Sequence, residues 1–91
     1  MKKIKMTVNG RVQGVGFRYM TKMVADQIGI TGIVRNEADG SVYIEAVGPG
    51  DKIDTFIEEV KRRHSPSGKV DSCSILEDAN IENYISFRVT N

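Results

Sequence analysis

Three glycines and two arginines lie close together between Gly10 and Arg18, in a segment that reads GRVQGVGFR and holds no acidic residue. Glycine allows positive φ angles and lets a ligand approach the main chain. Successive N–H groups turned inward in such a loop form an anion-binding concavity, and Arg18 adds a permanently charged guanidinium suited to phosphate. These residues predict an oxyanion site, most simply for a phosphoryl group. A glycine-rich turn that merely joins a strand to a helix is the alternative.

The residues after this segment strengthen the prediction of an anion site. They are apolar and compatible with a helix, so the loop leads into a helix N-terminus, where the dipole favours negative charge. The segment differs from Walker A, because no Lys-Ser/Thr pair closes it, and from the dinucleotide fingerprint, because the third glycine is missing after Gly14-Val15-Gly16.

Asn36 is the second candidate residue. It lies near the end of a predicted strand, just before Asp39-Gly40, which is a strong hairpin-turn signal. An asparagine near a turn usually serves the turn itself. Its neutral amide can also hold a water molecule through one donor and one acceptor, so both interpretations stay open.

The other reactive side chains favour structural roles. His64 follows Arg63 at a predicted helix end, where it would complement the helix dipole. Cys73 is expected to be a small core residue rather than a nucleophile, and Met20 and Met23 are expected in the core. No cluster of His, Cys or carboxylate residues has metal-ligand spacing, so we expect neither a metal nor a cofactor.

Length and composition predict one small domain, residues 1–91. Thirteen basic and twelve acidic residues leave a net charge of +1, which argues against a nucleic-acid partner held by bulk phosphate attraction. The single cysteine fits a reducing compartment. Since no apolar run could span a bilayer and the basic N-terminus lacks the apolar part of a signal peptide, we expect a cytoplasmic monomer.

Hydrophobic periodicity predicts the elements that would position the candidate residues. The predicted order is a strand from 4 to about 9, a helix over 17–28, strands over 32–36 and 42–46, a helix with its apolar stripe over 53–60, a strand over 70–76 and an edge strand through residues 84, 85, 87 and 89. Both helices are amphipathic and should share one face of a mainly antiparallel sheet of four to five strands. This βαββαβ order is the ferredoxin-like α+β sandwich.

Two blocks of the sequence resemble the signature of the acylphosphatases. The first is the segment GRVQGVGFR, and the second is GIVRNEADGSV at 32–42, followed by Gly48. The spacing of the blocks, the element order and the Ser65-Pro66-Ser67 loop also agree, so the resemblance covers essentially the whole chain. There are two departures: Ile33 stands where an aromatic residue is usual, and the C-terminal Thr90-Asn91 lacks the usual terminal tyrosine.

The resemblance implies an enzyme that hydrolyses the carboxyl–phosphate anhydride of acyl phosphates and releases inorganic phosphate. It implies that Arg18 binds the phosphate and that Asn36 positions the attacking water. The amides that would cradle the phosphoryl oxygens are those of Gly10, Arg11, Val12, Gln13, Gly14, Val15 and Gly16. The residue content agrees, since the sequence offers no obvious proton donor and a carboxylate, with a pKa near ~4, can leave unprotonated.

Two other functions stay open at this level. One is a non-catalytic module that holds a phosphate-bearing ligand or a protein partner; related acylphosphatase-like domains occur inside larger carbamoyl-phosphate-handling proteins. The other is a nucleic-acid-binding ferredoxin-like domain, which is disfavoured because the strands lack the paired aromatic residues that stack bases.

Overall fold

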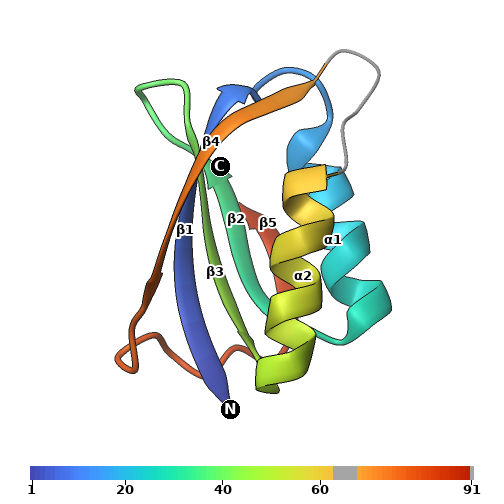
Figure 1. The fold of residues 1–91 in the computed structure, drawn as a ribbon, viewed down its shortest axis with the longest axis vertical. Helices are drawn as coiled ribbons and strands as arrows, with labels where there is room; N and C mark the ends of the chain where they lie inside the picture. The colour runs from blue at the N-terminus through green and yellow to red at the C-terminus, as the bar shows by residue number, and fades with distance from the viewer. Residues whose placement is uncertain (63–67, 91) are drawn as a thin grey trace.

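The computed structural model describes residues 1–62 and 68–90, in which five strands form one sheet and two helices cover one of its faces (Figure 1). The elements are β1 (Lys2–Arg11), α1 (Phe17–Ile28), β2 (Thr31–Asn36), β3 (Val42–Gly48), α2 (Gly50–Arg62), β4 (Lys69–Glu77) and β5 (Phe87–Thr90). The strand order is β4-β1-β3-β2-β5; β5 runs parallel to β2 and the other pairs are antiparallel. The predicted ferredoxin-like α+β fold is confirmed.

The core lies between the sheet and the helices, as the alternation along the strands requires. Its central layer comes from β1 and β3, where apolar side chains pair directly across the strands and are almost fully buried: Ile4 with Ala46, Met6 with Ile44 and Val8 with Val42. α2 adds Ile53, Phe56 and Val60. The Phe56 and Phe87 ring centroids lie 5.9 Å apart in a tilted arrangement, which fastens β5 to this core.

Three local expectations are wrong. β1 runs to Arg11 rather than to about Asn9, because Gly10 and Arg11 pair with β4 beyond a bulge. Tyr84 and Ile85 lie outside β5, in a segment held on the sheet by long-range contacts described below. Met23, which was expected in the core, is 48% exposed.

The buried positions of α1 explain the exposure of Met23. They follow the sequence Phe17, Thr21, Val24 and Ala25, which places Met23 outside the stripe that faces the sheet. Met20, by contrast, packs against the core as expected. The predicted loop at Ser65-Pro66-Ser67, the helix-end residues Arg63 and His64, and Asn91 lie outside the described residues.

Both described helices are too short and too polar to cross a membrane. α1 ends as predicted at Gly29, which has a left-handed φ of 92°. The N–H groups of Gly29 and Ile30 both donate to the Ala25 carbonyl, each at 2.8 Å, and so close the helix C-terminus.

Gly32 sets how closely β2 approaches β3. Its φ is 151°, and a Cβ atom at this position would lie 1.8 Å from the carbonyl oxygen of Glu45. This overlap is with main chain, which cannot move aside as the end of a flexible side chain could. β2 therefore depends on glycine here to keep its register with β3.

We predict that Gly32→Ala lowers the free energy of unfolding by roughly 3 kcal/mol or more, because β2 must separate from β3. Gly40→Ala is the control: Gly40 also has a positive φ, 93°, but nothing lies within 4 Å of where its Cβ atom would be, so only backbone strain of about 1 kcal/mol is expected. Urea unfolding measures both values. Equal losses would contradict the steric account.

Candidate active site

The segment 12–16, here called the glycine loop, joins β1 to α1 and is fixed at both ends. Val12 is 1% exposed and Phe17, the first residue of α1, is 2% exposed. Both side chains belong to the core cluster. The loop between them therefore has little freedom to change its path, although Gly14 and Gly16 are themselves exposed.

Gly14 and Gly16 give the loop its backbone shape. Their φ angles are 73° and 80°, both left-handed, and nothing lies within 4 Å of where a Cβ atom would be. The glycines are therefore required by conformation rather than by crowding. The open space beside them leaves the main chain approachable.

Among the described residues, no acidic or capping side chain of α1 compensates the positive end of its helix dipole. Its N-cap residue is Gly16, no side chain caps it, and the first turn holds no acidic residue. The first intrahelical bond runs from the Met20 N–H to the Gly16 carbonyl at 3.1 Å. N–H groups earlier in the helix have no intrahelical acceptor, so this end favours an anion.

Arg18, in the first turn of α1, reaches towards the ends of β2 and β5. Its guanidinium donates to the Thr90 carbonyl at 3.4 Å. Thr90 pairs with Arg35 across the two parallel strands, and its hydroxyl donates to the Val34 carbonyl at 3.5 Å. The contact uses one of the five N–H donors of the guanidinium and orients the side chain near the last residues of β2.

Asn36 is the last residue of β2 and shares a face with Val34, which is fully buried in the core beneath the helices. Its Oδ1 atom is buried and has no hydrogen-bond partner among the described residues. Such an unpaired acceptor costs about 1–3 kcal/mol and calls for an explanation. Within this part of the chain, the side chain that shapes the turn is that of Asp39, whose Oδ1 accepts from the Ser41 N–H at 2.9 Å and from its hydroxyl at 2.6 Å.

A glutamine links the glycine loop to the β2–β3 turn. The Gln13 Nε2 donates to the carbonyls of Glu37 at 2.7 Å and Ser41 at 2.8 Å. The glycine loop, the start of α1 and the ends of β2 and β5 thus meet at one end of the molecule (Figure 1). The Gln13 side chain and the Thr90 carbonyl were not predicted; the signal for Gln13 was a single amide side chain between Val12 and Gly14.

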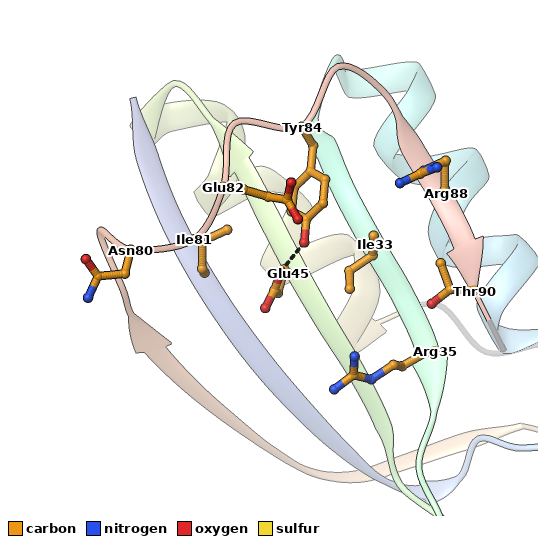
Figure 2. Close-up of a pocket in the computed structure, with 9 residues that line it drawn as sticks. All are labelled: Ile33, Arg35, Glu45, Asn80, Ile81, Glu82, Tyr84, Arg88 and Thr90. Carbon is orange, nitrogen blue, oxygen red and sulfur yellow. Dashed lines mark hydrogen bonds between the residues drawn. The ribbon is translucent and has the colours of Figure 1, made fainter.

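A separate hollow of about 570 Å³ lies on the outer face of the sheet, away from the helices, and neither Arg18 nor Asn36 lines it (Figure 2). Ile33 and Arg35 reach it because they alternate with Val34 and Asn36 along β2. The departure at Ile33 therefore falls on the face opposite Asn36.

The polar side chains of this outer face interact with one another. Glu45 accepts hydrogen bonds from Tyr43, at 2.6 Å, and from Tyr84. Burial is the main cause that raises the pKa of both tyrosines, and the hydrogen bond to Glu45 raises it further. Both hydroxyl groups therefore stay protonated and act as donors. Arg35 lies over the Tyr43 ring at 4.7 Å and pairs with Glu37 at 3.5 Å. The Tyr84 hydrogen bond to Glu45 holds the segment before β5 on the sheet.

Cys73 on β4 is half-buried and packs against the core, and burial raises the pKa of its thiol. This is the environment of a structural cysteine, as expected, because a reactive one needs a lowered pKa. Across residues 1–62 and 68–90, no three His, Cys, Asp or Glu side chains come together as a group that could hold a metal ion.

The chain is similar to known acylphosphatases over almost its whole length. The profile of the family described as Acylphosphatase matches residues 4–89. An acylphosphatase of Enterococcus faecalis is 57% identical over 98% of both chains, and one of Lactiplantibacillus plantarum is 45% identical over the full length of both. The crystal structure of an acylphosphatase from Bacillus subtilis superposes with a TM-score of 0.94 at 41% identity, covering both chains completely. The chain belongs to the acylphosphatase family.

Proposed function

We propose that this protein hydrolyses acyl phosphates to a carboxylate and inorganic phosphate at the end of the sheet where Arg18 and Asn36 lie. The observation that carries the proposal is the uncapped N-terminus of α1 behind a left-handed glycine loop, on the same face of the sheet as the unpaired Asn36 Oδ1. The first feature suits a phosphoryl group, and the Asn36 amide, with one donor group and one acceptor, suits a water molecule.

The phosphoryl group is held by main-chain N–H groups and by one guanidinium. The amides from Val12 to Gly16 and the start of α1 surround its oxygens, and Arg18 supplies a full positive charge. Gly10 and Arg11, although counted in the loop from the sequence, belong to β1 and pair with β4, so their amides contribute less. Phosphoryl transfer depends mainly on such positioning and on stabilising the charge of the equatorial oxygens.

Asn36 orients the attacking water. Its side-chain amide, which has both a donor and an acceptor, holds the water and turns the water oxygen towards the phosphorus. An amide is not a base, so the proton of the water passes to an oxygen of the substrate phosphate. The role is positional, and holding a nucleophile at the correct angle is worth several orders of magnitude in rate.

The leaving group explains why this set of residues is sufficient. The P–O bond to the acyl oxygen breaks, and the electron pair leaves on a carboxylate, which is a weak base with a pKa near ~4. No proton donor is needed. An alkoxide leaving from a phosphate monoester would need one, so the residues favour mixed anhydrides over ordinary esters. Arg18 and the amides supply the charge compensation without a metal or cofactor.

The chain acts in this proposal as one domain, residues 1–91, and as a cytoplasmic monomer. The described residues share one sheet and one core, which supports a single domain. The free thiol of Cys73 supports a reducing compartment.

The first prediction separates an enzyme from a binding module. With benzoyl phosphate as substrate and EDTA in excess, the protein is expected to release many equivalents of phosphate per chain. The measurement is phosphate release over time. Binding of one equivalent without further release would instead support the non-catalytic alternative, a module that holds a phosphate-bearing ligand.

The second prediction concerns the phosphate contact. Arg18→Ala should abolish inhibition by inorganic phosphate and lower kcat/KM by on the order of 10²–10³-fold or more, because a preorganised donor to the phosphoryl oxygens is lost. Arg62→Ala is the matched control, since Arg62 is an exposed arginine on α2 that pairs with Glu59; its kinetics should stay at the wild-type level. Undiminished phosphate inhibition in Arg18→Ala would contradict the assignment.

The third prediction concerns the water. Asn36→Ala should lower kcat by on the order of 10²-fold, since the water loses its orientation, while the inhibition constant for inorganic phosphate changes little. Asn83→Ala, at an exposed asparagine before β5, serves as the control. Wild-type turnover by Asn36→Ala would remove Asn36 from the mechanism.

A further inference from the structure

The Gln13 side chain spans two parts of the site that are distant in sequence. Its backbone belongs to the glycine loop, whereas its Nε2 donates to Glu37, which is 24 residues away, and to Ser41, which is 28 residues away. The two distances, 2.7 and 2.8 Å, lie at the short end for N–H···O hydrogen bonds. Both hydrogens of the amide nitrogen are used.

The two acceptors lie where the β2–β3 turn closes. The Glu37 N–H donates to the Ser41 carbonyl at 2.9 Å, and the Gly40 N–H donates to the Glu37 carbonyl at 3.2 Å. Gln13 adds a second donor to each carbonyl. It therefore binds the turn at the two residues whose hydrogen bonds define its shape.

Gln13 is also the link between the two halves of the proposed site. In the part of the chain that the structure describes, this one amide makes the hydrogen bonds between the glycine loop and residues 36–41. Glu37 directly follows Asn36, so holding the Glu37 carbonyl also holds the main chain that carries Asn36. The relative position of the phosphate loop and Asn36 thus depends on this bridge.

We propose that Gln13 is a positioning residue, which keeps the water on Asn36 in line with the phosphorus held by the glycine loop. The inference rests on the proposed function, in which the loop binds the phosphoryl group and Asn36 orients the water. Gln13 acts here through its side chain and through Asn36. A misplacement of about 1 Å at a reacting centre can cost on the order of 10²-fold in rate.

Two variants remove the donors while keeping the size of the side chain. Gln13→Met has no donor, and Gln13→Glu has the same shape but presents carboxylate oxygens to the two carbonyls. Both should lower kcat for benzoyl phosphate by roughly 10- to 100-fold. In Gln13→Met the inhibition constant for inorganic phosphate should change less than about threefold, because the amides and Arg18 remain, whereas the added carboxylate of Gln13→Glu should also weaken phosphate inhibition by charge repulsion. Gln27→Met, at an exposed glutamine on α1, is the control and should match the wild type.

A double-mutant cycle with Asn36→Ala tests whether Gln13 acts through Asn36. Adding Gln13→Met to Asn36→Ala should lower kcat little further, because a water that is no longer oriented by Asn36 gains nothing from the bridge. A loss of folded protein would instead lower the rate equally in both backgrounds. Urea unfolding of each variant gives the folded fraction to which the rates are normalised.

The outcomes separate the two claims. The proposed function stands if the wild type turns over and Asn36→Ala does not. In that case, a wild-type kcat in Gln13→Met and Gln13→Glu overturns the positioning role alone. Fully additive losses in the double-mutant cycle overturn it as well. Absence of turnover by the wild type overturns the proposed function and the role of Gln13 with it.

Discussion

The structure depends on keeping main-chain polar groups of the glycine loop exposed at one end of the molecule, in a fixed shape that suits an anion. Backbone N–H groups stabilise charge well only when they do not have to reorganise. Here Val12 and Phe17 are buried on either side of the glycine loop, while Gly14 and Gly16 hold the left-handed turns between them. The core therefore contributes directly to the site by fixing the path of the loop.

β2 connects the core, the site and the outer face. Val34 and Asn36 face the helices, whereas Ile33 and Arg35 lie on the opposite face among the side chains of the outer hollow. Because the side-chain period is two, a slip of one residue would exchange these faces. The close contact of Gly32 with β3 therefore also helps to fix which residues of β2 face the helices.

Local patterns predicted the elements, and motif resemblance predicted the family. Alternation along β1 and the Phe17–Ile28 stripe depend on neighbours in sequence, so they can be read directly. The expectations that failed depend on distant partners. Pairing with β4 extends β1 to Arg11, and the Tyr84 hydrogen bond to Glu45 holds Tyr84 outside β5. The bridge from Gln13 to the β2–β3 turn likewise has no local signal beyond one polar residue.

The central claim is that the glycine loop and Arg18 bind the phosphoryl group. A titration of the wild-type protein with inorganic phosphate, followed by ¹H–¹⁵N correlation spectra, tests it most directly. We expect the largest shifts at the amides from Val12 to Gly16 and at Arg18, with smaller ones at the Asn36 side chain. Arg35 and Arg88 both line the outer hollow; shifts concentrated there, with the glycine loop unchanged, would contradict the account.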